Sequence, residues 1–267
     1  MTDPSLPAAQ AAPVNPKQGR GVRMALMALP LGTVLLSIAS FGIWWFKKQT
    51  VEDRTYAYAS ALRREMTPQA VEKFERVARE VLALPTEDRL PSMAAFLESS
   101  MGAENMGYQV RETDFTFEPT ESSIIDVELT GKQRPRDVAI LLATYGGDLA
   151  KVESDSLGLA TLMALAHSVA GEGTVRTLRF AALPDGLTDP RGRDSVMAFA
   201  DDCRTRDERV THVWVLGNTA LKAIREAFRA ESTGCVAQMV PVPETATDAV
   251  EEAGLLRSIL FEEANRP

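Results

Sequence analysis

The chain has 267 residues, with 29 basic residues, 37 acidic residues and two histidines. Five of the basic residues and one of the acidic residues precede residue 49, so residues 49–267 hold 24 basic against 36 acidic residues, a net charge of −12. A surface this acidic repels nucleic acid and anionic lipid, and no basic cluster interrupts it. We therefore expect no nucleic-acid partner, and a segment of about 220 residues suits one domain of moderate size.

An uncharged segment of 23 residues, Met24–Phe46, lies near the N-terminus. As a helix it would be roughly 34 Å long, which is enough to cross a hydrocarbon core of about 30 Å. Arg23 and Lys47 flank the segment, and Trp44–Trp45 stand where interfacial aromatic residues are common. The pattern predicts a single transmembrane helix over residues 24–46, with membrane lipid as its partner.

A cleaved signal peptide is the alternative interpretation of this segment, with Ile38–Ser40 as its cleavage site. The apolar run continues past that site and is too long for an ordinary signal peptide, which favours an uncleaved signal anchor. Residues 1–23 are rich in Pro and Ala, and we expect a disordered tail there. Three basic residues lie close to each end of the span, so the positive-inside rule assigns no orientation.

The residues that follow the span, 47–88, have a helical pattern, and we group them as a juxtamembrane stalk. Thr67 is the expected N-cap of a helix that has Pro68 at its first position. A second helix is expected over Arg89–Met101, with Gly102 at its end. The second helix is expected to pack on the domain that follows.

From residue 108 onward, short apolar strands alternate with helices. The first two strands alternate polar and apolar residues, as half-buried antiparallel strands do, whereas the later strands are continuous apolar runs typical of strands covered on both faces. This order predicts an α/β three-layer sandwich over residues 89–267 with a mostly parallel central sheet. The expected strands are 108–117, 124–129, 138–143, 177–183, 210–216 and 235–240, and the expected helices are 158–170, 193–203, 218–230 and 246–264.

The order of these segments resembles the co-catalytic zinc aminopeptidase family, whose fold also serves glutaminyl cyclases and the protease-like domain of the transferrin receptor. The resemblance runs from about Leu90 to Asn218 and rests on Asp137–Gly146, Glu153–Gly158 and Thr177–Leu187 in this order. It implies a site with two zinc ions, one of which activates water while the other holds the substrate. The zinc ligands in this family come from the ends of strands.

The positions that the resemblance assigns to zinc ligands are degenerate in this chain. A His-x-Asp motif is replaced by Thr144 to Gly146, and the bridging aspartate by Ser154, with Asp155 one residue away. A Glu-Glu pair, whose first member is the general base, is replaced by Pro184 and Asp185. The full set of degenerate positions is Thr144, Gly146, Ser154, Asp155, Pro184 and Asp185.

Proline cannot transfer a proton, so no catalytic residue is expected in place of the base. The strand at 211–216 lacks the family's aspartate, and no histidine follows His212. A zinc site needs three or four ligands, whereas only Asp155 and Asp185 remain as candidates for a metal. We therefore expect no bound zinc or other cofactor.

The two histidines and two cysteines form no metal-binding motif. His167 lies in an apolar helical segment and His212 in the middle of a strand, so both are interpreted as packed structural residues. Cys203 and Cys235 could form one disulfide or remain free thiols.

Loop carboxylates are a further candidate site, because they follow the carboxyl ends of strands, where open α/β sheets place their clefts. They could hold a hard cation such as calcium or receive a basic peptide, and the alternative is that they are solvated loop residues. These carboxylates are Asp148, Glu153, Asp155, Asp185 and Asp189.

Two functions follow from these observations. The first is a membrane-anchored, catalytically inactive aminopeptidase-like domain that binds a protein partner or a second copy of itself. Its C-terminal helix is a candidate contact surface, with Val250, Leu255, Leu256 and Ile259–Phe261 at helical spacing; packing on the sheet is the alternative for these residues. The second function is a membrane-bound metal-dependent hydrolase, either with a rearranged metal site for a single ion at Asp155 and Asp185 or as part of a hetero-oligomer that supplies the missing residues. Because most relatives of this architecture act outside the cytoplasm, the domain is expected on the extracytoplasmic side.

Overall fold

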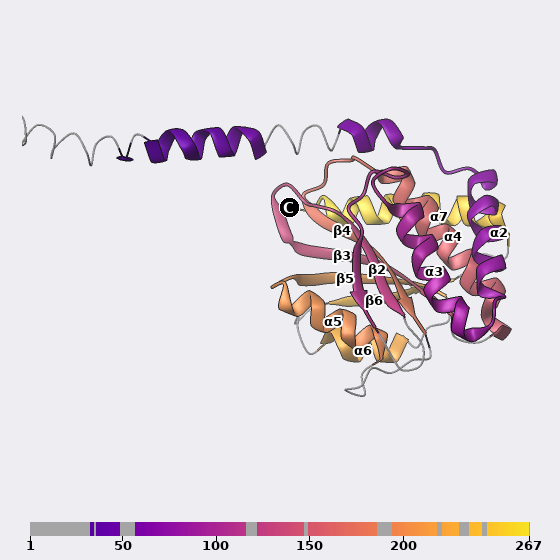
Figure 1. The fold of residues 1–267 in the computed structure, drawn as a ribbon. Coiled ribbons are helices and arrows are strands. Elements are labelled where there is room, and N and C mark those ends of the chain that lie inside the picture. The colour runs from indigo at the N-terminus through magenta and orange to yellow at the C-terminus, as the bar shows by residue number, and fades with distance from the viewer. Residues whose placement is uncertain are drawn as a thin grey trace, which may run out of the picture. The chain divides into compact units, whose positions relative to one another are not determined.

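The computed structural model describes residues 33–34, 36–48, 57–115, 122–146, 149–185, 194–217, 221–229, 235–241 and 245–266 (Figure 1). The chain divides into two compact units, Met1–Asp53 and Arg54–Pro267.

In the first unit, residues 33–34 and 36–48 are helical, and apolar side chains such as Leu36 and Trp45 are 68% and 57% exposed. The predicted membrane span, Met24–Phe46, also includes residues 24–32 and 35, which lie outside the described residues. Within the part of the chain that the structure describes, no helix combines the length and apolar character needed to cross a bilayer.

The second unit begins with a short helical segment, residues 57–62, followed by α2 (Pro68–Leu82) and α3 (Thr86–Met101). Thr67 is the N-cap of α2, as predicted, and its side chain accepts a hydrogen bond from the backbone N–H of Ala70. The buried face of α2 packs against α4 (Val152–Val169) and α7 (Ala246–Ala264). The helix that the sequence grouped with the stalk at 47–88 is therefore part of the packed α/β unit.

The described residues form a six-stranded sheet in the order β1-β2-β4-β3-β5-β6. The strands are β1 (Arg111–Asp114), β2 (Ser123–Leu129), β3 (Arg134–Tyr145), β4 (Arg176–Pro184), β5 (Arg209–Leu216) and β6 (Val236–Val240).

The sheet is mixed, which corrects the prediction of a mostly parallel sheet. β3 pairs in parallel with β4 and β5, and β5 pairs in parallel with β6, whereas β2 pairs antiparallel with both β1 and β4. Only residues 130–133 connect β2 to β3, and a parallel neighbour requires a crossover of a dozen or more residues. β2 therefore joins the sheet antiparallel, beside β4.

Helices cover both faces of the sheet, which gives the predicted three layers. α2, α3, α4 (Val152–Val169) and α7 (Ala246–Ala264) lie on one face, and α5 (Ser195–Thr205) and α6 (Leu221–Arg229) lie on the other (Figure 1). α4 is apolar on nearly every side because the sheet covers one side and α2 covers another. It begins at the carboxyl end of β3, after the 3-10 turn η1 (Leu149–Lys151), six residues earlier than its apolar pattern indicated.

The C-terminal helix α7 uses one side for packing. Leu256 and Leu260 are buried in the core with 4% and 1% exposure, whereas Leu255 and Ile259 are 65% and 49% exposed. The predicted contact surface is thus divided between core residues and a pair of exposed side chains one turn apart.

Candidate functional site

The carboxyl ends of the parallel strands β3 and β4 bring the predicted site residues to one edge of the sheet. Thr144 lies near the end of β3 and Gly146 directly follows that strand, while Pro184 ends β4 and Asp185 follows it. The backbone N–H of Asp185 donates a hydrogen bond to the Tyr145 carbonyl over 2.8 Å, so the two strand ends are fixed beside each other.

Gly146 leaves no room for a side chain at the end of β3. Its φ of +85° lies in the left-handed region that favours glycine, and an added Cβ would lie 2.1 Å from Cδ2 of Leu90 on α3. The neighbouring Arg89 is 4% exposed and donates two hydrogen bonds to the Leu84 carbonyl, and its Nη1 lies 3.5 Å from the Gly146 carbonyl oxygen. α3 therefore fills the space beyond the end of β3.

Two carboxylates and a lysine lie between the start of α4 and the end of β4. Lys151 Nζ lies 3.2 Å from Asp185 Oδ2. The pKa of Asp155 is raised to about 7, mainly by burial and further by the nearby charge of Asp185. Lys151 and Ser154 both lower this pKa and so oppose the rise. The structure thus brings Asp155 and Asp185 close enough to interact. The hydroxyl of Ser154 donates a hydrogen bond to the Lys151 carbonyl over 2.9 Å.

The other members of the predicted acidic cluster are placed less closely. Glu153 is an exposed residue of the first turn of α4. Asp148 and Asp189 lie outside the described residues.

The residues at this edge do not fit a pair of zinc ions. Among the described residues, no group of three or more His, Cys, Asp or Glu side chains is arranged to hold a metal. Of the predicted metal ligands among the described residues of this edge, Asp185 pairs with Lys151, and the pKa of Asp155 is raised to about 7, which favours its protonated form. Zinc requires three or four deprotonated protein ligands.

Both histidines lie in packed surroundings away from these carboxylates, in line with their interpretation as structural residues. His212 stacks on Trp214 with ring centroids 5.2 Å apart, and its Nδ1 lies 3.1 Å from Glu263 Oε1. His167 Nε2 lies 2.9 Å from the Leu62 carbonyl oxygen. Burial lowers the pKa of both imidazoles.

A buried network of charges lies on the face of the sheet covered by α5. Arg179 on β4 is completely buried and binds Asp126 on β2 over 2.8 Å and Glu208 over 2.6 Å. Its guanidinium also stacks over Phe199 at 4.6 Å and lies 3.2 Å from the Cys203 sulfur. Because Arg179 is near the start of β4, this network joins the strands and α5 away from the edge where the candidate site lies.

The structural roles of Arg89, Lys151 and Arg179 were not predictable from the sequence. Lysine and arginine are normally exposed, so a single charge next to an apolar run gives no sign that it is buried or paired. Lys151 lies two residues before Glu153, the first residue of the segment Glu153–Gly158 that carried the family resemblance, and this proximity was a weak signal for its place at the site. Cys203 and Cys235 are both free, the former buried and the latter half-buried.

No protein-family model and no curated protein sequence matches the chain. Solved structures with similar folds include a glutaminyl cyclase from Fimbriiglobus ruber, with a TM-score of 0.55, 12% identity, and coverage of 75% of this chain and 96% of that one. An exopeptidase from Bacteroides vulgatus, described as zinc-dependent, has a TM-score of 0.54 and 9% identity, with coverage of 77% of this chain and 98% of that one. The LapA aminopeptidase of Legionella pneumophila has a TM-score of 0.50 and 10% identity, with coverage of 80% of this chain and 75% of that one.

These likenesses show that the fold is the α/β fold of glutaminyl cyclases and zinc-dependent exopeptidases. The described strands and helices contain that fold, as the resemblance in the sequence indicated. At identities this low, the likeness concerns the fold alone.

Proposed function

We propose that this protein is a membrane-anchored, catalytically inactive relative of the zinc aminopeptidases that acts as a binding or scaffold module. The observation that carries this proposal is the end of β3, where Leu90 fills the space that a side chain at position 146 would need. In the proposed correspondence, that position belongs to a zinc ligand.

The neighbouring positions support the same proposal. Pro184 stands where the general base would be and has no group that accepts a proton. Asp185 pairs with the ammonium group of Lys151, so a positive charge of the protein itself neutralises the carboxylate that would otherwise attract a cation. We therefore propose that the protein has no zinc cofactor.

The membrane anchor is proposed over residues 24–46. Two observations support it: the segment carries no charge, and its described residues 36–46 are helical with exposed apolar side chains. We place the α/β unit on the extracytoplasmic side by analogy with the relatives. A reporter enzyme fused to the C-terminus tests this orientation, and reporter activity in the cytoplasm would overturn it.

For the binding role, we propose a protein partner or a second copy of the chain at α7. Leu255 and Ile259 are one turn apart and exposed, and burying them on a partner would remove apolar surface from water. The double change L255K/I259K is expected to abolish cross-linking to that partner in native membranes. Unchanged cross-linking would exclude α7 as the contact.

The alternative function is a hydrolase that uses a single metal ion at Asp155 and Asp185, and its supporting observation is the interaction of these two carboxylates. Elemental analysis of the purified full-length chain decides between the two functions, together with turnover of aminoacyl chromogenic substrates and of a peptide with N-terminal glutamine. The inactive module predicts less than stoichiometric metal and no turnover. Stoichiometric metal and turnover that are both lost in D155N/D185N would overturn it.

A further inference from the structure

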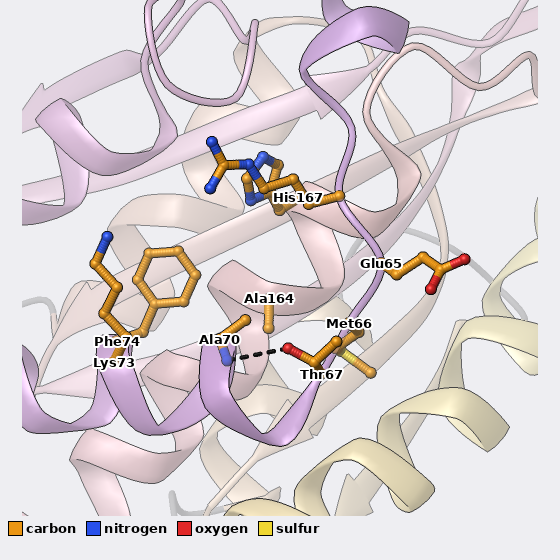
Figure 2. A pocket seen from close by; sticks show the side chains of 9 residues that line it. Glu65, Met66, Thr67, Ala70, Lys73, Phe74, Ala164 and His167 are labelled. Atoms are coloured by element: carbon orange, nitrogen blue, oxygen red, sulfur yellow. Dashed lines mark hydrogen bonds between the residues drawn. The ribbon is translucent and has the colours of Figure 1, made fainter.

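A cavity of about 360 Å³ opens between the connection that precedes α2, α2 itself and α4 (Figure 2). Met66, Phe74 and Ala164 of α4 form part of its apolar wall. Arg64, Lys73 and His167 supply polar groups. The volume lies within the range of about 300–1,000 Å³ that is typical of small-molecule sites.

The cavity is not part of the candidate site at the carboxyl ends of the strands. α4 begins at that edge of the sheet and runs away from it, so Asp155 and His167 are separated by twelve residues of helix. At about 1.5 Å per residue, this spacing is roughly 18 Å. The cavity therefore lies toward the opposite edge of the sheet.

Arg64 and Lys73 are two cations without an ion-pair partner among the described residues. Their neighbours behave differently: Arg63 pairs with Glu172 over 2.8 Å, and Arg79 pairs with Glu75. No carboxylate of the described residues therefore forms an ion pair that offsets the positive charge of Arg64 and Lys73 at the cavity, although residues 49–267 have a net charge of −12.

Neither of the other ionisable groups of the cavity neutralises this charge. Figure 2 shows the carboxylate of Glu65 pointing to the side opposite Lys73. His167 Nε2 lies 2.9 Å from the Leu62 carbonyl oxygen, which only accepts, so Nε2 carries the proton of this bond. Burial lowers the pKa of the ring, which favours the neutral imidazole. The positive charge of the cavity thus comes from Arg64 and Lys73.

We propose that this cavity binds a small amphipathic carboxylate, with the carboxylate between Arg64 and Lys73 and a short aliphatic or aromatic tail against Phe74 and Met66. The guanidinium of Arg64 suits bidentate binding of a carboxylate, and Lys73 adds a second charge on a flexible stem. The apolar wall contributes by removing the tail from water. Charge and shape together therefore select an organic anion over an inorganic one.

The test uses the full-length chain in nanodiscs of zwitterionic lipid, titrated with hexanoate in a calorimeter, with empty nanodiscs as the blank. Hexanoate is expected to bind with a dissociation constant of about 0.1–1 mM, which is within the limits for a ligand of this size. Hexanol, which has the tail without the charge, and acetate, which has the charge without the tail, are both expected to bind at least about tenfold more weakly.

The double change R64Q/K73Q is expected to weaken hexanoate binding at least about tenfold. The matched control is R76Q/R225Q, which removes two positive charges from exposed positions of α2 and α6 outside the cavity and should leave binding unchanged. No heat above the blank, equal binding of hexanol, or equal loss in the control would each overturn the proposal. Because both changed side chains are exposed, a melting temperature close to that of the parent verifies the fold of each variant. Failure here would leave the inactive-module proposal standing, since that proposal rests on the opposite edge of the sheet.

Discussion

The packing of α3 against the end of β3 predicts that even the smallest side chain at position 146 is costly. In Gly146→Ala, the methyl group would lie 2.1 Å from Leu90 Cδ2, and the backbone would keep a φ of +85° that disfavours any residue with a Cβ. The left-handed conformation costs about 1–2 kcal/mol for a residue other than glycine. Forcing a methyl into this filled space adds about 1–3 kcal/mol.

We therefore expect G146A to lower the free energy of unfolding by about 2–5 kcal/mol. For a domain of this size, that loss corresponds to a fall of roughly 4–20 °C in melting temperature. The measurement is a thermal or denaturant unfolding curve of the full-length chain in a non-ionic detergent. Gly254→Ala is the control, because nothing lies within 4 Å of its added Cβ on an exposed position of α7. It should raise stability by up to about 1 kcal/mol.

A double-mutant cycle with Leu90→Ala separates the steric cost from the backbone cost. L90A alone removes a side chain that is 1% exposed and should cost about 2–5 kcal/mol. In the L90A background the methyl at position 146 has room, so the further cost of G146A should fall by about 1–3 kcal/mol. An equal cost of G146A in both backgrounds, or a G146A variant as stable as the parent, would refute the reasoning.

Three further predictions concern buried charges and thiols. Arg179→Met should lower the free energy of unfolding by about 3–5 kcal/mol in an unfolding curve, since it leaves buried carboxylates without their counterion. The control is Arg136→Gln, which breaks an ion pair between side chains that are 74% and 79% exposed and should change the free energy of unfolding by less than about 1 kcal/mol. The raised native pKa of Asp155 means that its contribution to stability is fully present below the unfolded pKa of 3.8 and is lost as the pH rises through about 7. D155N should therefore match the parent at acidic pH and exceed its stability above pH 8 by on the order of 1 kcal/mol after allowance for solvent screening. Parallel curves of stability against pH for D155N and the parent would contradict the assignment. Burial raises the pKa of the Cys203 thiol to about 12 and that of Cys235 to about 11, so alkylation followed by mass spectrometry should label the half-buried Cys235 slowly in the folded protein and the buried Cys203 only after unfolding.

Local features of the structure were accessible from the sequence, because they depend on residues a few positions apart. Thr67 is an N-cap by virtue of its side chain and the following proline, and β4 reads as a strand from its own apolar run. The C-terminal helix begins and ends at the predicted residues, Ala246 and Ala264. α4 was placed correctly but was predicted to start too late, since its polar first turn hides the helical period.

The direction of β2 and its place in the sheet were decided by chain topology. Its apolar pattern is the same whether its neighbour is β3 or β4, and only the short connection to β3 excludes a parallel pairing. The buried position of Arg179 likewise depends on Asp126, more than fifty residues away in the chain, which supplies the charge that makes its burial tolerable.

The candidate site shows the same division. By itself, the sequence determined that Thr144, Gly146 and Pro184 offer no metal ligand or base, because side-chain chemistry is fixed by residue identity. Only the tertiary structure decided that Leu90 occupies the space beside Gly146 and that Lys151 pairs with Asp185. It also decided that two cations meet over one cavity from the connection before α2 and from α2 itself. Such contacts join segments whose separation along the chain carries no signal of proximity, and packing of the whole domain is what brings them together.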